Sequence, residues 1–436
     1  MTRLEQLSRT IALYKADLGI AGDAAIDAAM RRINVLLAIG HPASSTRAGQ
    51  SSVLTAAMLL ARSGVQVFVL ANEGPLVGHH PPFEGSSLHE AVQSVNGELI
   101  KGTPIRVGTP DRIDIAFDFG TASSIAPYQS PRTVSVGWSA WSGEISDWPP
   151  QPPVTEFDWP MRAMAAAVLV AAEVAKMVAR NLKDLSLDAG AVMEHFATSR
   201  HARLILAEES TPKCAALGDF TAVSAGAVTN GMFYALCRMP GIHGRMITFD
   251  GDCSEQSNLN RNMLLLQRFL TGELSQKTRL LEHFGHGLKV ISVPRRFDAN
   301  ELPALLGRVV VGVDHVPTRW LLAQGKYDWM GVGATSHFDV LSSFHYPYSG
   351  CPACLHPHDD AAAPQITPTI AYVSFLAGLL LATDLIVDVG GATANLTSKQ
   401  RFISTRAFGR ELSEDKRTVF VRHDCPAGCP ASQIKR

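Results

Sequence analysis

Apolar runs of strand length alternate along the chain with glycine-containing loops and longer helical patterns. In the first half, runs at 34–39 and 65–71 enclose a polar loop and a helical pattern at 53–62. Continuous apolar runs of this kind are typical of buried parallel strands. The order strand, loop, helix and strand therefore predicts a parallel α/β unit. We also expect a helix up to residue 32, strands at 113–120 and 133–140, and a long alanine-rich helix at 161–182.

The same order of elements returns after residue 200. A predicted strand enters the loop SAGAVTNG, a helix follows, and a long apolar helix near 370–387 closes this half. The strands expected here lie at 220–223, 245–250, 288–293 and 308–314. A repeated order predicts a duplicated domain. The predicted fold is therefore α/β, with two tandem Rossmann-like domains at 1–195 and 196–436 whose sheets are mostly parallel.

Composition narrows the class of protein. Of the 436 residues, 46% are hydrophobic and 18% are charged, which is typical of a globular chain. The net charge of −1 gives no reason to expect nucleic acid as a partner. The N-terminus is mixed and charged rather than signal-like, so we expect a cytoplasmic protein. The apolar stretch at 370–387 is near the minimum length of a membrane span, but Asp384 lies inside it, which favours a core helix and no membrane partner.

The run FDGDCSEQSNLNRN, from Phe249 to Asn262, is rich in polar chemistry. Asp250 ends a predicted strand, where a carboxylate can bind ribose hydroxyls or simply cap a loop. Asp252, Asn258 and Arg261 follow, and Lys277 lies sixteen residues beyond Arg261. An arginine and a lysine that converge on a triphosphate stabilise charge that moves onto departing pyrophosphate. Each residue alone also fits a solvated helix start, but the combined pattern is more specific.

Two further features flank this run. The loop Ser224 to Gly231 stands where a glycine-rich phosphate loop would stand, although Gly226 alone remains of the three expected glycines. Its position between an apolar strand and a helix is what supports phosphate binding. Asp314 ends the run RVVVGVD and is a candidate magnesium ligand, with helix capping as an equal alternative.

Four of the seven cysteines form two close pairs, CPAC at Cys351 and Cys354 and CPAGC at Cys425 and Cys429. Without a secretion signal, metal binding is favoured over disulfides. Four thiolates suit a closed, structural zinc site, with His356 and His358 as competing ligands. We expect Cys237 in the core. Cys214 and Cys253 are candidates for a reactive thiol, although an ordinary role is expected for both.

The SAGAVTNG loop, FDGDCSEQSNLNR, Lys277, VVVGVDHVPTR and the paired cysteines together resemble the ThiF/MoeB/ubiquitin-activating superfamily over about residues 200–436. Its members use ATP and magnesium to adenylate the C-terminal carboxylate of a ubiquitin-like or sulfur-carrier protein. The resemblance implies catalytic roles for Arg261, Lys277 and Asp314. It implies these contacts: ribose with Asp250, phosphates with Asp252, Asn258, Arg261 and Lys277, and magnesium with Asp314.

The first half resembles the same fold without this chemistry, since VLANEGP follows its second strand. By resemblance, such a partner half lends an arginine from its N-terminal helix, and Arg9 and Arg3 are the candidates. Two halves paired within one chain would suffice as a monomer, and a homodimer stays open.

These features predict adenylation of a ubiquitin-like protein, with a conjugating enzyme's cysteine as the acceptor. Family members that form a thioester commonly carry their own cysteine in the crossover between Cys354 and the helix near 370, and this segment has none. Adenylation of a sulfur carrier or small peptide without a thioester step therefore stays open. Two other classes are a nicotinamide-dependent oxidoreductase, which the degenerate loop argues against, and a catalytically dead scaffold that binds a ubiquitin-like protein.

Overall fold

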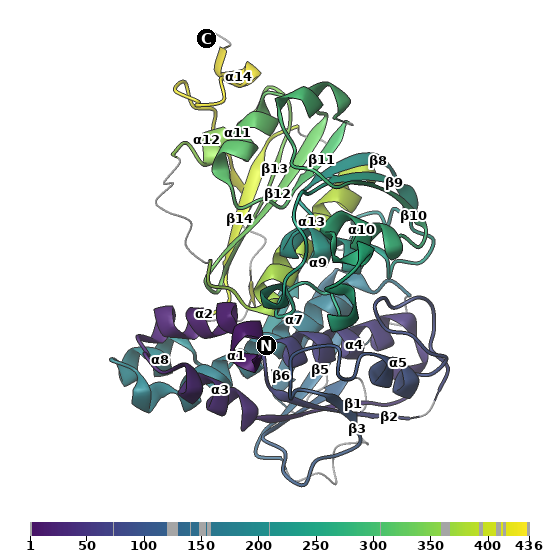
Figure 1. The fold of residues 1–436 in the computed structure, drawn as a ribbon, viewed down its shortest axis with the longest axis vertical. Coiled ribbons are helices and arrows are strands. Elements are labelled where there is room, and N and C mark those ends of the chain that lie inside the picture. Colours follow the sequence, from purple (N-terminus) through teal and green to yellow (C-terminus); the bar gives the residue numbers. More distant parts are fainter. Residues whose placement is uncertain are drawn as a thin grey trace.

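The strands of the computed structural model form two eight-stranded sheets (Figure 1). The structure describes the chain except residues 1, 73, 120–129, 140, 148–153, 155–157, 209, 306, 359–366, 392–395, 407–410, 413–415 and 434–436. The first sheet has the order β15-β7-β6-β5-β4-β1-β2-β3. Its strands are β1 (Asn34–Ile39), β2 (Gln66–Ala71), β3 (Ile105–Val107), β4 (Ile115–Phe119), β5 (Thr133–Ser139), β6 (Ser142–Asp147), β7 (His201–Ile205) and β15 (Glu411–Leu412).

The second sheet has the order β10-β9-β8-β11-β12-β13-β14-β16. Its strands are β8 (Ala216–Val223), β9 (His243–Phe249), β10 (Leu288–Val293), β11 (Arg308–Val311), β12 (Trp329–Ser336), β13 (Asp339–His345), β14 (Lys399–Ser404) and β16 (Arg417–Thr418). Pairing is parallel from β10 to β12 and antiparallel from β12 to β16.

The two sheets repeat one another strand for strand. Read from β3 to β7, the first sheet has the same order as the second sheet read from β10 to β14. Both change from parallel to antiparallel pairing after the fifth strand of that order. This topology confirms the predicted α/β fold of two tandem, mostly parallel sheets. The chain changes sheets between β7 and β8, later than residue 195, and β15 returns to the first sheet.

Helices from both halves pack between the sheets (Figure 1). These helices are α4 (Arg47–Arg62), α7 (Met161–Asn181), α9 (Ala227–Leu236) and α13 (Ala371–Val389). A helix that is apolar on all sides needs burial on all sides, and α13 is covered over 83% of its most apolar window. Among the described residues it is the helix long and apolar enough to cross a membrane. Its Asp384 is satisfied inside the protein, by Arg401 at 2.8 Å and the Ser342 hydroxyl at 3.0 Å.

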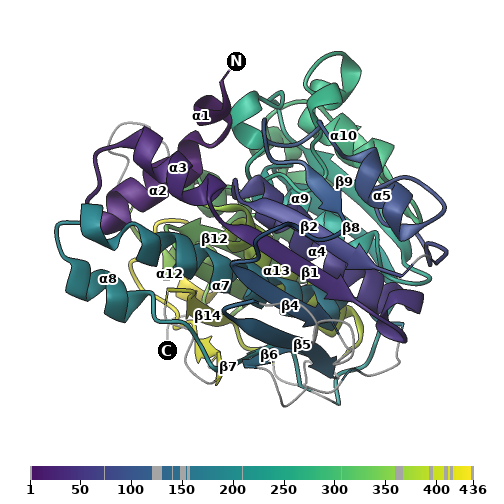
Figure 2. The ribbon, with the colours of Figure 1, turned by 90° about the horizontal axis from the view of Figure 1, so that it is seen from below.

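The N-terminal segment is three helices rather than the single helix expected up to residue 32. They are α1 (Arg3–Gln6), α2 (Ser8–Leu18) and α3 (Asp23–Arg31). The break after α2 falls at Gly19, whose φ of 65° is a left-handed conformation that favours glycine. In both views these helices lie beside α8 (Ala189–His195), at one side of the molecule (Figure 1, Figure 2). The α2 helix contacts the second half, because Asp17 bonds His337 at 2.8 Å.

Shorter elements complete the fold. The other helices among the described residues are α5 (Leu88–Ser94), α10 (Lys277–His283), α11 (Val316–Ala323), α12 (Pro352–Leu355) and α14 (Pro430–Gln433). The 3₁₀ turns are η1 (Ala43–Ser45), η2 (Lys183–Leu185), η3 (Gln256–Asn258), η4 (Gln267–Phe269), η5 (Glu273–Ser275) and η6 (Ala299–Ala304).

Candidate active site

An open cavity of about 870 Å³ lies at the carboxyl ends of β8, β9 and β11. In an open parallel sheet this edge is where ligands bind, at the point where the strand order reverses. All the residues that the sequence assigned to nucleotide binding line the cavity. They are Gly226, Asp250, Asp252, Asn258, Arg261, Lys277 and Asp314.

The phosphate-loop segment is held by Asp250. The chain leaves β8 through Ser224, and Gly226 then caps the amino end of α9. Asp250 accepts the Ala225 N–H at 2.8 Å through Oδ2 and the Asp252 N–H at 2.9 Å through Oδ1. This carboxylate therefore connects the end of β9 to the loop that precedes α9. The amino end of α9 faces the cavity, which favours a bound anion.

Lys277 is the first residue of α10 and forms an ion pair with Asp252, and both side chains line the cavity. Its Nζ lies 3.1 Å from Asp252 Oδ2, and Arg296 lies 3.6 Å from Oδ1. Partial burial raises the pKa of Asp252, but Lys277 and then Arg296 outweigh it and hold that pKa below its ordinary value. Asp252 is therefore ionised at neutral pH. A phosphate that recruits Lys277 competes with this carboxylate.

Asn258 ends η3, and Arg261 lies on the turn that follows it. Asn258 Oδ1 accepts the Glu255 N–H at 2.8 Å, and Arg261 Nη1 donates to the Ser257 carbonyl at 2.6 Å. Burial and, after it, the nearby cation of Arg9 lower the pKa of Arg261 to about 9, against the opposing effect of Asp314 and Glu255. The side chain is thus a desolvated cation close to a second arginine.

Arg9 reaches the cavity from the first half of the chain. It lies on α2, lines the cavity and donates from Nη1 to the Thr367 carbonyl at 3.2 Å. Burial lowers the pKa of Arg9, opposed by Asp314 and Glu255.

Arg3, the other arginine that the first half could contribute to the site, does not line the cavity. Its side chain is 4% exposed and packs inside the first half. There it bonds Asp27 at 2.6 Å and the Lys101 carbonyl at 2.9 Å.

A second pocket of about 370 Å³ adjoins the cavity and shares Asp250 and Asp314 with it. Its apolar lining comprises Val223, Phe249, Phe297 and Val313. The rings of Phe249 and Phe297 meet edge to face, with centroids 5.3 Å apart. A planar, largely apolar group fits such a wall. Sequence reasoning missed Phe297, because it reaches the site from a loop whose path no short motif specifies. Glu255 lies within the run from Phe249 to Asn262, but the sequence analysis gave it no role.

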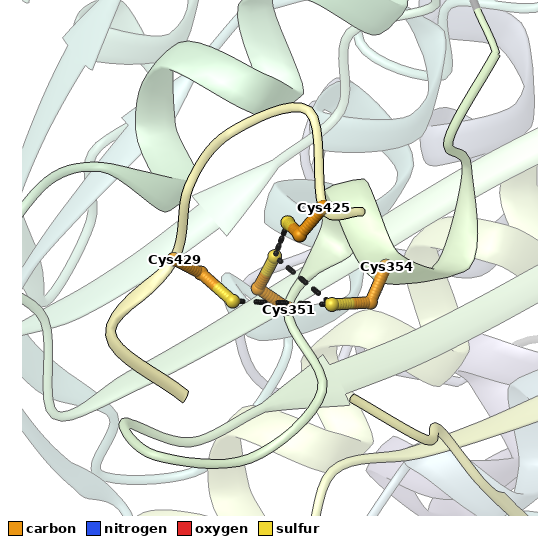
Figure 3. A group of neighbouring side chains, drawn as sticks. All are labelled: Cys351, Cys354, Cys425 and Cys429. Carbon is orange, nitrogen blue, oxygen red and sulfur yellow. Dashed lines mark hydrogen bonds between the residues drawn. The ribbon is translucent and has the colours of Figure 1, made fainter. Parts of the chain in front are cut away.

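The four paired cysteines converge beside α11 (Figure 3). Their Sγ atoms all lie within 4.8 Å of one another. Neighbouring sulfurs are 3.5 Å apart for Cys351 and Cys425, 3.7 Å for Cys351 and Cys354, and 3.9 Å for Cys354 and Cys429. Tetrahedral zinc with Zn–S bonds of about 2.3 Å needs sulfurs about 3.8 Å apart. The donor set and its spacing therefore fit zinc. In the described part of the chain, this group contains neither His356 nor His358.

The cysteine cluster packs against a helix that borders the cavity. Ala323 at the end of α11 belongs to the same buried cluster as the four cysteines, and Trp320 packs against it. Trp320 Nε1 donates to the His356 carbonyl at 2.8 Å, next to the first cysteine pair. Arg319 of α11 lines the cavity and bonds the Val313 carbonyl. The cluster thus holds one wall of the site.

The remaining cysteines differ in access. Cys253 is exposed, lines the cavity and lies 3.3 Å from Gln276 Oε1. Cys214 is half-buried, and its thiol faces the Ala216 carbonyl at 3.5 Å. Burial raises the pKa of Cys237, so this thiol is a poor nucleophile. The part of the crossover at 359–366 lies outside the described residues.

Comparison with known proteins gives a family match within the first half. Residues 34–199 match the BilD N-terminal domain. No curated protein matches the chain.

Similar solved structures are distant. E. coli MccB is 15% identical with a TM-score of 0.39, over 70% of this chain and 96% of MccB. E. coli TcdA, a tRNA N6-threonylcarbamoyladenosine dehydratase solved with AMP, is 14% identical with a TM-score of 0.31, over 41% of this chain and 88% of TcdA. PaaA is 14% identical with a TM-score of 0.34, over 47% of this chain, which spans 64% of the length of PaaA.

Proposed function

We propose that this chain uses ATP to adenylate the C-terminal carboxylate of a ubiquitin-like protein. The observation that carries the proposal is the convergence of Arg9, Arg261 and Lys277 with Asp250 and Asp314 on one cavity. The three basic side chains can neutralise the negative charge of a triphosphate. The carboxylate of Asp250, at the end of a strand, can accept hydrogen bonds from ribose hydroxyls.

The two adjoining pockets give the nucleotide an orientation. The apolar pocket beside Phe249 and Phe297 takes the base, and Asp250, which borders both pockets, takes the ribose hydroxyls. The triphosphate then extends toward Lys277, Arg261 and Arg9. Asp314 is exposed near Arg9 and Arg261, where its carboxylate fits a magnesium ligand. Magnesium bound there would neutralise phosphate charge.

The reaction follows from this orientation. A carboxylate oxygen of the substrate attacks the α-phosphorus, and the bond between that phosphorus and the bridging oxygen of the β-phosphate breaks. Pyrophosphate leaves with the electron pair, so negative charge grows beside Arg261, Lys277 and Arg9. Donors held in place beforehand stabilise this charge without reorganising, which lowers the barrier.

The acyl-adenylate then needs an acceptor. We propose the cysteine of a conjugating enzyme: its thiolate attacks the acyl carbon, a thioester forms, and AMP leaves. Among the described residues, Cys253 is the cysteine that lines the cavity, which makes it the candidate for an internal thioester.

The test is ATP–pyrophosphate exchange that depends on a candidate carrier, such as a small β-grasp protein encoded beside this gene. Exchange with the carrier and none without it supports the proposal, and a thioester product identifies the acceptor. Exchange with a short peptide in place of a folded carrier would instead support peptide adenylation. Absence of ATP binding together with binding of a nicotinamide cofactor would favour an oxidoreductase. A third outcome would identify a scaffold: the chain binds the carrier but does not bind ATP, and Arg261→Ala leaves carrier binding unchanged.

A further inference from the structure

Arg62, the last residue of α4, extends from the first half into the second. Its side chain is fully buried, and its guanidinium donates to backbone carbonyls there. Nη1 bonds the carbonyl of Leu259, and Nη2 bonds those of Met263 at 3.2 Å and Leu265 at 2.6 Å. Burial lowers the pKa of Arg62 to about 9, opposed by Tyr234. A buried guanidinium needs hydrogen-bond acceptors for its donors. The described residues supply them to both Nη atoms of Arg62, although not to its Nε.

The three carbonyls belong to the turn at 259–265, which follows η3 and carries Arg261. This turn is irregular, since η3 ends at Asn258 and the N–H groups of Arg261 and Asn262 both bond the Asn258 carbonyl, at 3.1 and 2.9 Å. Buried carbonyls that regular helix bonds do not use need another donor. The guanidinium of Arg62 supplies this donor. Because the guanidinium is rigid and planar, it also joins the two ends of the turn, residues 259 and 265.

Arg261 lies between the joined ends, so its position depends on the shape of the turn. The turn is held on its other side by α9, because Asn230 Oδ1 accepts the Leu264 N–H at 2.9 Å. Its Asn260 also bonds the Thr10 hydroxyl at 3.2 Å, next to Arg9. The turn that carries Arg261 is therefore held from both halves, by Arg62 and Thr10 of the first half and by Asn230 of the second.

We propose that Arg62 is a positioning residue for the triphosphate, which sets the direction of Arg261 by clamping the turn at 259–265. This inference rests on the proposed adenylation site. The first half then contributes two arginines to the site: Arg9 lines the cavity, and Arg62 holds the turn that carries Arg261.

Arg238 provides a matched control. It follows α9 as Arg62 ends α4, and it is also fully buried. Its guanidinium lies 3.4 Å from the centroid of the Tyr234 ring and bonds the Tyr234 carbonyl at 3.1 Å, within its own half. Replacing it removes a buried arginine of the same kind while leaving the turn at 259–265 bonded.

The experiment compares Arg62→Met, Arg62→Lys and Arg238→Met by calorimetric titration with Mg-ATP and, separately, with adenosine. A displaced Arg261 loses phosphate contacts but leaves the ribose and base contacts intact. We expect Arg62→Met to weaken ATP about tenfold or more, with adenosine affinity within about twofold of wild type. Arg62→Lys should recover part of the loss, because an ammonium still donates to some of the carbonyls. Arg238→Met should bind both ligands as wild type does.

Hydrogen exchange without nucleotide gives a second readout. Amides at 259–265 should exchange faster in Arg62→Met than in Arg238→Met, and Arg62→Lys replaces Arg62→Met if the latter does not fold. Wild-type ATP affinity in folded Arg62 variants, or equal losses for ATP and adenosine, would overturn the inference. If wild type binds no ATP, the proposed function fails, while the exchange rates still decide whether Arg62 holds the turn.

Discussion

In each half, a buried amide on the first turn of the central helix bonds the loop that follows the next strand. In the first half, Gln50 Oε1 accepts the Val77 N–H at 2.7 Å, and its Nε2 donates to the carbonyls of Ser44 and Pro75, both at 2.8 Å. In the second half, Asn230 bonds Leu264, much further along the corresponding loop. The loop after β2 is therefore bonded to the first turn of α4 by its residues 75 and 77. Residues of the loop after β9 instead line the cavity. The loop after the second strand therefore follows a different path in the two halves.

The polar chemistry at the two edges differs in the same way. The strand β9 is followed by Asp250 inside the cavity, and β2 is followed by Asn72, an exposed amide. Yet the first half keeps a role at the other half's site, because Arg9 lines the cavity and Asp17 anchors its helix to His337. A side chain of one half thus lines a cavity at the sheet edge of the other half.

The largest effect is expected for Arg261→Ala. Removing a desolvated cation beside the phosphates should lower carrier-dependent ATP–pyrophosphate exchange by about a hundred- to a thousandfold. Arg112→Ala is the control in the first half, since this arginine is exposed beside Asp114, and it should change exchange less than about twofold. Comparable losses in both variants would show that the second half's cavity is not the site.

The next largest contrast is between Arg9→Ala and Arg3→Met. Arg9→Ala should reduce exchange by about a hundredfold with little change in unfolding temperature. Arg3→Met breaks a buried ion pair with Asp27, so it should lower the free energy of unfolding by about 3–5 kcal/mol while affecting exchange mainly through stability. Unfolding temperatures measured together with exchange rates distinguish the loss of activity in Arg9→Ala from the loss of stability in Arg3→Met. An inactive Arg3→Met protein that melts like wild type would undermine the assignment of Arg9.

Metal removal tests whether the cysteine cluster holds a wall of the cavity. We expect about one zinc per chain by elemental analysis. Cys354→Ser should lose the metal, lower the unfolding temperature and weaken ATP binding, because α11 carries Arg319 and packs on the cluster. Cys214→Ser should keep metal and affinity. Full ATP affinity in metal-free protein would show that the cluster and the cavity are independent.

The smallest effect concerns Asp252 and pH. Because Lys277 and Arg296 hold the pKa of Asp252 below its ordinary value, its stabilising contribution is complete above that ordinary pKa, near 3.9. It disappears as pH falls through the lowered pKa. The carboxylate is 54% exposed, so the gain over Asp252→Asn should be under about 1 kcal/mol at pH 7. Urea unfolding of both proteins at pH 7 and pH 3 measures it, and a gain that grows toward pH 3 would contradict the ion pair.

Strands and helices with strong apolar signals could be predicted closely. The runs at 34–39 and 288–293 are β1 and β10 residue for residue, and the helices at 161–182 and 370–387 are α7 and α13 within two residues. The strands that the sequence missed include β3, β6, β7 and β13 to β16. Most of them are short or pair antiparallel toward the sheet edges, where short or interrupted apolar runs form strands through tertiary pairing.

The site could be predicted as a set of residues but not as a complete geometry. The motif residues gather on one cavity because the carboxyl ends of parallel strands share an edge. The roles of Arg62 and Gln50 could not be foreseen, since their partners lie at distant backbone positions. Residue type carries no information about such bonds.

The central claim is that one chain completes its own adenylation site with Arg9 from the first half and Arg261 from the second. The most direct measurement mixes Arg9→Ala and Arg261→Ala proteins and follows carrier-dependent ATP–pyrophosphate exchange against wild type. If each site is completed within one chain, the mixture stays as inactive as either variant alone. Recovery of a substantial fraction of wild-type exchange would contradict the account, because it would require that Arg9 of one chain serves the cavity of another.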